Sequence, residues 1–150
     1  TLIFAVALPL LAGVIGSIST IAEIDTWYLA LNKPSFNPPN WVFAPVWTIL
    51  YVLMGIAFYL ILTSKVKHKS AAIGLFLLQL LLNVLWSFIF FGLHNPIVAL
   101  FEIIFLWGAV LYTTIAFDRI SNIASYIIFP YVLWVSFAFI LNLSIVILNP

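Results

Sequence analysis

The chain has 150 residues, of which 66% are hydrophobic and only 6% are charged, and its mean hydropathy is +1.29. A soluble domain carries about 25% charged residues, so this composition excludes that class and predicts a polytopic membrane protein. The net charge of +1, with no basic run, excludes a nucleic acid partner. Because the chain has no cysteine, a disulfide framework and a thiolate metal site are also excluded.

Five continuous apolar runs are long enough to cross a bilayer, which takes about 20 helical residues. They cover residues 2–22, 41–64, 70–92, 96–117 and 125–148. Hydrophobic and polar residues do not alternate as they do in a membrane barrel. The predicted fold is therefore all-α, a single domain over residues 1–150 built as a bundle of five transmembrane helices. The first run lacks a basic leading segment and is too long for a signal peptide, so we expect a retained helix.

The first run contains small residues at four-residue spacing. The pairs are Ala12/Gly16, Gly13/Ser17 and Gly16/Thr20. Small residues let membrane helices approach closely. This pattern indicates either tight packing inside the bundle or a dimer seam, and we expect packing inside the bundle.

The connection over residues 23–40 is the only long one, and it is rich in proline and aromatic residues. Pro34, Pro38 and Pro39 fix the backbone φ angle, so the segment is shaped in advance at little entropic cost. Long ordered connections are usually functional, and we expect this one to act as a lid over a ligand site. Aromatic residues also gather at membrane interfaces, so a simple interfacial anchor is the competing interpretation.

The second run is predicted to form one wall of that site. Asn40 is expected to cap a helix that begins at Trp41. Aromatic rings and a glycine then follow at four-residue spacing on one face: Phe43, Trp47, Tyr51 and Gly55. We expect the glycine to leave a gap beneath the rings, which favours a flat aromatic ligand.

Positive charges are unevenly distributed between the connections. With five spans, the side that holds the N-terminus carries Lys65, Lys67, Lys69 and Arg119, whereas the other side carries only Lys33. Because positive residues accumulate on the cytoplasmic side, we expect the N-terminus in the cytoplasm and the 23–40 connection outside.

Polar residues inside the third and fourth runs require partners. Gln79, Asn83 and Ser87 recur at four-residue spacing, so this stripe faces another helix or a cavity. A hydrogen-bond seam and a binding wall are both compatible with that spacing. Glu102 lies about 9 Å along the fourth helix from Pro96, and we expect a structural rather than a catalytic role for its carboxyl group.

The fifth run repeats the combination of a ring with a gap. Pro130 is expected to kink the helix. Beyond it, one face carries Trp134, Ala138, Leu141 and Asn142, and the small alanine leaves space beside the indole. We therefore expect the second and fifth helices to bring Trp47 and Trp134 toward one cavity.

Three stretches carry residues in the order and spacing of a known family. They are Trp27-Tyr28, Lys33-Pro34, Phe36, Pro38-Pro39, Trp41-Val42-Phe43, Pro45-Val46-Trp47, Leu50-Tyr51 and Met54-Gly55; then Gln79, Leu82-Asn83, Trp86 and Phe90-Phe91-Gly92; then Pro130-Tyr131, Trp134, Phe137-Ala138 and Leu141-Asn142. Together they resemble the translocator protein family (TspO/MBR), also called tryptophan-rich sensory proteins or peripheral-type benzodiazepine receptors, and in particular its bacterial members. The resemblance spans nearly the whole chain.

This resemblance implies a dimeric five-helix bundle in the bacterial plasma membrane. Its pocket beneath the first loop would bind tetrapyrroles such as protoporphyrin IX, and also isoquinoline-carboxamide or benzodiazepine-type ligands. The positions that match the family's pocket are Tyr28, Trp47, Tyr51, Asn83, Trp134, Ala138 and Leu141. Some bacterial members are reported to degrade protoporphyrin IX in light and oxygen, with two tryptophans that match Trp47 and Trp134.

One departure concerns the cholesterol motif of the mitochondrial members, which ends in a tyrosine and an arginine. Here Leu143 and Ile147 stand at those two positions, so a dedicated cholesterol function is not expected.

The inventory of reactive groups favours binding over turnover. His68 and His94 fall in connections, so no typical axial haem ligand lies within the membrane and a metal-free porphyrin suits the pocket better than haem. No hydrolytic constellation is evident, and no cofactor or metal is required. We expect a receptor or sensor, with photo-oxidative degradation as a second option. A transporter of porphyrin, lipid or sterol is a further alternative, although no internal repeat supports it. A structural membrane subunit is the last.

Overall fold

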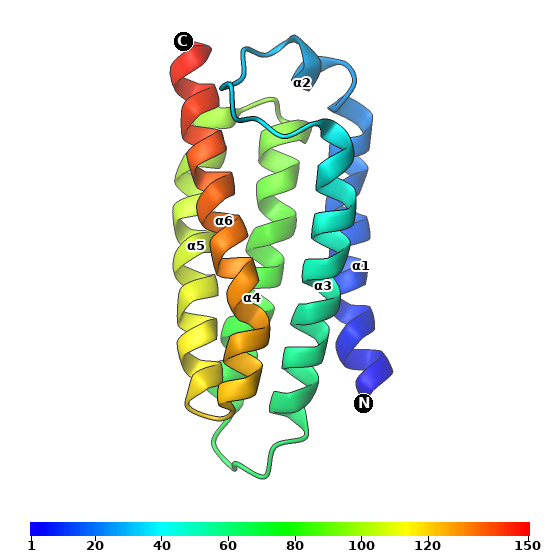
Figure 1. The fold of residues 1–150 in the computed structure, drawn as a ribbon, viewed down its shortest axis with the longest axis vertical. Helices are drawn as coiled ribbons and strands as arrows, with labels where there is room; N and C mark the ends of the chain where they lie inside the picture. Colours follow the sequence, from blue (N-terminus) through cyan, green and yellow to red (C-terminus); the bar gives the residue numbers. More distant parts are fainter.

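The computed structural model describes residues 1–150 and contains five long helices (Figure 1). They are α1 (Leu2–Glu23), α3 (Asn40–Leu62), α4 (Ser70–Ser87), α5 (Pro96–Asp118) and α6 (Asn122–Leu148). A π-helical turn, η1 (Phe88–Gly92), extends α4. All five are long and apolar enough to cross a membrane. The predicted all-α bundle of five transmembrane helices is therefore confirmed.

The helices run side by side along the long axis of the molecule, and the 23–40 connection covers the end at which the C-terminus lies (Figure 1). Helix α5 packs against α4 and α6, and α3 packs against α1 and α6. Helix α1 also contacts α4, whereas α3 and α4 scarcely touch. The bundle therefore leaves space between α3 and α4 at its centre.

The start of α3 differs from the prediction. The helix begins at Asn40 with Pro39 in the capping position, and no side chain caps it. The predicted Asn40 cap is wrong because Asn40 itself belongs to the first turn, and the carbonyl of Pro39 accepts a hydrogen bond from the Val42 amide at 3.0 Å. Helix α6 also begins earlier than expected, at Asn122, because the Ser121 side chain caps it.

Two glycines allow α1 to approach α3 closely. A Cβ atom at Gly55 would lie only 2.5 Å from the Cα of Val6, so Gly55 contacts the backbone of α1. The gap expected beneath the α3 rings is therefore not at Gly55. Gly13 of α1 instead makes room for the Tyr51 ring itself, because a Cβ there would lie 2.6 Å from Cδ2 of Tyr51. Small residues of α1 thus serve packing inside the bundle, as expected.

The 23–40 connection contains a one-turn helix, α2 (Trp27–Ala30), which the sequence did not indicate. The Lys33 ammonium group donates hydrogen bonds to the carbonyls of Tyr28 and Leu31 at 2.9 and 3.1 Å. The Tyr28 hydroxyl donates to Asn37 Oδ1 at 3.0 Å. Burial raises the pKa of the Tyr28 phenol, and the bond to Asn37 opposes this shift. These polar contacts order the connection, and hydrogen bonds between Asn32 and Asn149 attach it to the end of α6.

Candidate functional site: an aromatic cavity within the bundle

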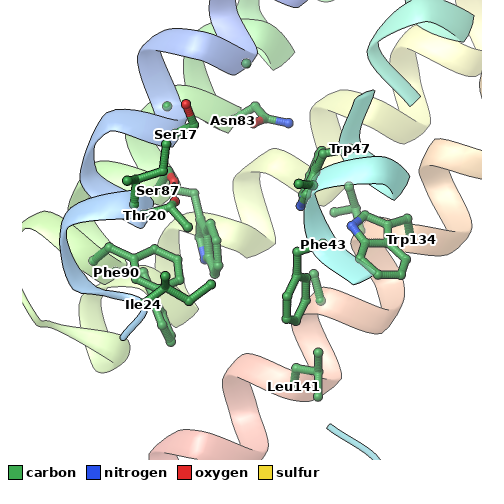
Figure 2. A pocket seen from close by; sticks show the side chains of 18 of the residues that line it. Ser17, Thr20, Ile24, Phe43, Trp47, Asn83, Ser87, Phe90, Trp134 and Leu141 are labelled. Carbon is green, nitrogen blue, oxygen red and sulfur yellow. Dashed lines mark hydrogen bonds between the residues drawn. The ribbon is translucent and has the colours of Figure 1, made fainter. Parts of the chain in front are cut away.

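A cavity of about 610 Å³ lies among α1, α3, α4 and α6 and reaches the 23–40 connection. Ligand pockets in proteins span about 300–1,000 Å³, so this volume suits a small molecule. Most of the lining is hydrophobic. Figure 2 shows two opposed walls, one from α1 and α4 and the other from α3 and α6.

The α3 and α6 wall is built from aromatic rings (Figure 2). The Trp47 and Trp134 rings meet edge to face, with centroids 6.3 Å apart and planes at 89°. Phe43 packs against Trp134 at 6.2 Å, and Tyr51 stacks on Trp47 at 5.5 Å. The Trp134 Nε1 atom is buried and has no hydrogen-bond partner. This wall therefore offers aromatic faces for stacking, whereas the unpaired Nε1 atom of Trp134 is buried behind them.

The opposite wall carries hydroxyl and amide groups. Thr20 of α1 and Ser87 of α4 share a hydrogen bond of 2.9 Å, and Ser17 lies beside them (Figure 2). The sequence indicated Ser17 and Thr20 as small residues for packing inside the bundle or for a dimer seam, since spacing does not show which neighbour a helix face meets. Ser87 belonged to the polar stripe predicted to face a helix or a cavity, and it faces both.

Asn83 connects this wall to the bundle core. Its Oδ1 atom accepts from the Tyr51 hydroxyl at 3.0 Å, and its Nδ2 atom donates to the Tyr131 hydroxyl at 2.6 Å. Asn83 also lines the cavity. Its amide is therefore fixed by two phenols from neighbouring helices, which confirms the hydrogen-bond seam at this residue, whereas a part in ligand binding stays a prediction.

The π-helical turn η1 closes the end of the cavity beneath the connection. An extra residue in this turn redirects Phe90 and Phe91. Phe90 stacks on Trp86 at 4.9 Å, and Phe91 packs on Tyr28 at 5.5 Å. The Trp86 indole donates to Asn142 Oδ1 at 3.0 Å, which joins α4 to α6. Composition gave no signal for this turn.

The structure brings every predicted site residue to the same cavity. All of them line it: Tyr28, Trp47, Tyr51, Asn83, Trp134, Ala138 and Leu141. Their roles in ligand binding stay predictions. Glu102 lies outside the lining, with both carboxylate oxygens buried and without a hydrogen-bond partner. His94 also lies outside it, and its Nε2 atom is 3.0 Å from Glu23 Oε2 at the end of α1.

Comparison with known proteins gives the family of the chain. The profile of the TspO/MBR family matches residues 5–148. The chain is 43% identical to the tryptophan-rich protein TspO of Chlorobaculum tepidum, over 100% of this chain and 96% of that protein. It is 41% identical to the protein of the same name from Archaeoglobus fulgidus, over 99% and 96% of the two chains. It is 37% identical to the human translocator protein, over 89% and 81%. With its five apolar helices, the chain is therefore an integral membrane protein that belongs to the TspO/MBR family.

Proposed function

We propose that the protein is a membrane receptor or sensor that binds tetrapyrroles such as protoporphyrin IX in the aromatic cavity. The single observation that carries this proposal is that an aromatic wall faces a hydroxyl-lined wall in a cavity of about 610 Å³. Such a space suits a flat apolar ring with polar groups at its edge. The relatives support a receptor or sensor, since one of them is a tryptophan-rich sensory protein that is 36% identical to this chain.

The residues of the cavity fit a metal-free ring. Trp47 and Trp134 provide faces for stacking, which contributes about 0.5–1.5 kcal/mol per aromatic pair beyond area burial. Thr20 and Ser87 share one hydrogen bond, so one of their two hydroxyl groups keeps a donor for a carbonyl or carboxylate of the ligand. No histidine lines the cavity to ligate a haem iron. Isoquinoline-carboxamide or benzodiazepine-type ligands, which also combine aromatic rings with a carbonyl, would occupy the same space, and the 23–40 connection would act as its lid.

A light-driven reaction is the second candidate, and it is favoured by the contact between the two indoles. A photoexcited porphyrin stacked near Trp47 or Trp134 could accept an electron from the indole, and oxygen could trap the resulting radical. We place this activity below binding, because binding needs only burial, stacking and one or two hydrogen bonds.

The setting of the protein completes the proposal. We infer a homodimer in a bacterial plasma membrane, with the N-terminus in the cytoplasm and the 23–40 connection outside. The positive residues Lys65, Lys67 and Arg119 at the opposite end of the bundle support this orientation. The similarity to the bovine and human translocator proteins also supports a location in a membrane.

The test is a titration of detergent-purified protein with protoporphyrin IX in the dark, followed by illumination in oxygen. The variants are Trp47→Phe and Trp134→Phe, with Trp107→Phe as the matched control because Trp107 lies outside the cavity. We expect saturable binding by the wild type and the control. If the indoles react, the wild type and the Trp107→Phe control will also bleach the bound pigment faster than the Trp47→Phe and Trp134→Phe variants. Equal bleaching by all four proteins would contradict the reaction, and wild type without saturable binding would contradict the receptor.

A further inference from the structure

The cavity is open on one side of the bundle. Several of its lining residues are exposed on the outer surface between α1 and α3. Val14 and Ile21 of α1 are 61% and 73% exposed, and Trp41 of α3 is 74% exposed. Ala44 and Thr48 of α3 are exposed lining residues as well. These five residues lie in transmembrane helices, so the opening that they border faces the lipid.

The opening exists because α1 and α3 pack closely at only one end. At the N-terminal end of α1, Ala5 and Pro9 are buried, and Val6 lies against Gly55. Farther along α1, Gly13 lies against the Tyr51 ring. After Gly13, α1 has no buried residue. Its side chains Ser17, Thr20 and Ile24 lie across the cavity from α3 (Figure 2). The two helices therefore separate toward the connection.

The aqueous end is closed by contrast. Tyr28 is only 4% exposed, and it packs on Phe90 and Phe91 beneath the connection. Lys33 and the contact of His94 with Glu23 tie the same segment to itself and to the ends of the helices. A ligand that came from water would have to break these contacts, whereas a ligand dissolved in the bilayer meets an existing gap.

We propose that the gap between α1 and α3 is a lateral portal, bordered by Val14, Ile21, Trp41, Ala44 and Thr48, through which the ligand enters the cavity from the lipid phase. This inference rests on the proposed function and narrows the ligand to molecules that partition into a bilayer. The portal is a path rather than a binding surface. Blocking it slows entry and exit together and leaves the equilibrium affinity nearly unchanged.

The absence of cysteine makes a direct test available. A single thiol is introduced by Ala44→Cys, and the folded, solubilised protein is divided into an untreated half and a half labelled with N-cyclohexylmaleimide. Each half is reconstituted into vesicles, and the binding of protoporphyrin IX is followed by quenching of tryptophan fluorescence. Ala22→Cys is the matched control, because Ala22 is also exposed on α1 but does not line the cavity. Comparing two halves of one preparation removes any effect on folding.

We expect the label in the Ala44→Cys variant to lower the association and dissociation rates together, by about tenfold or more, with little change in the dissociation constant. The label in the Ala22→Cys variant changes neither rate. Unchanged rates with the label in the Ala44→Cys variant would overturn the portal, and so would a weaker affinity without slower association. The portal would also be overturned if the Ala22→Cys thiol reacted with the label and the Ala44→Cys thiol did not, because other parts of the protein would then cover the gap. Wild type that never binds would instead refute the proposed function.

A second measurement separates the two routes without any mutation. Vesicles of different lipid compositions, which take up protoporphyrin IX to different extents, are compared at one aqueous concentration, so that only the mole fraction of the porphyrin in the bilayer differs. Entry through the portal predicts a rate proportional to the mole fraction in the bilayer. A rate that follows only the aqueous concentration would show entry beneath the connection.

Discussion

The substitution Gly13→Ala tests the packing that shapes the cavity. A Cβ atom at this position would lie 2.6 Å from Cδ2 and 3.0 Å from Cζ of Tyr51. Nonbonded carbon atoms prefer about 3.5–4.0 Å, so the ring must move by about 1 Å. That movement would stretch the 3.0 Å hydrogen bond from Tyr51 to Asn83 beyond a useful length.

The magnitude follows from three opposing contributions. Overpacking of a fitted contact costs about 1–3 kcal/mol, and the lost hydrogen bond costs about 1 kcal/mol more. The higher helix propensity of alanine stabilises the folded variant by about 1 kcal/mol. We therefore expect Gly13→Ala to destabilise the folded protein by about 1–3 kcal/mol. Because Tyr51 stacks on Trp47, the variant is also expected to bind protoporphyrin IX more weakly.

The assay is unfolding in mixed micelles by increasing SDS, followed by far-ultraviolet circular dichroism. Gly74→Ala is the matched control, since a Cβ at Gly74 has no atom within 4 Å. There, only the helix propensity acts, so the control is expected to be neutral or more stable by up to about 1 kcal/mol. The reasoning would be refuted if both substitutions changed the stability in the same direction and by the same amount.

Two further substitutions test the polar contacts. Asn83→Leu leaves the hydroxyls of Tyr51 and Tyr131 without their partner, and we expect a loss of about 1–3 kcal/mol in the same SDS titration. Asn83→Leu should cost less stability in a protein in which Tyr51 and Tyr131 are already phenylalanine. An unchanged cost would contradict the hydrogen bonds between Asn83 and the two tyrosines. Lys33→Met removes the ammonium group that holds α2, so amides of the 23–40 connection should exchange hydrogen about fivefold faster by mass spectrometry. Lys67→Met in the opposite connection is the control, and equal exchange in both variants would contradict the anchoring role.

Much of the architecture could be predicted because helix periodicity and bilayer thickness fix it. Continuous apolar runs specify five spans, and four-residue spacing specifies that Trp47 and Tyr51 share a face. The same argument places Trp134 and Ala138 on one face of α6. The approach of these two faces to one cavity was inferred because both helices carry a tryptophan beside a small residue.

The parts that the sequence did not reveal depend on which helix meets which. Spacing identifies a small-residue face but not its partner, so Gly55 was assigned to the rings although it contacts α1. The hydroxyls of Ser17 and Thr20 were assigned to packing for the same reason. The π-helical turn at Phe88–Gly92 arises from a single extra residue, and the four residues of α2 are too few to show a period.

The most direct test of the central claim fills the cavity. Ala138→Phe would place a ring inside it, whereas Ala71→Phe adds the same ring at an exposed position of α4 outside the lining. Protoporphyrin IX is titrated into each detergent-purified variant and into the wild type in the dark. We predict saturable binding by the wild type and by Ala71→Phe, and an affinity at least about tenfold weaker for Ala138→Phe, which is about 1.4 kcal/mol. Equal affinity of all three proteins would contradict the account, because the porphyrin would then be bound somewhere other than the aromatic cavity.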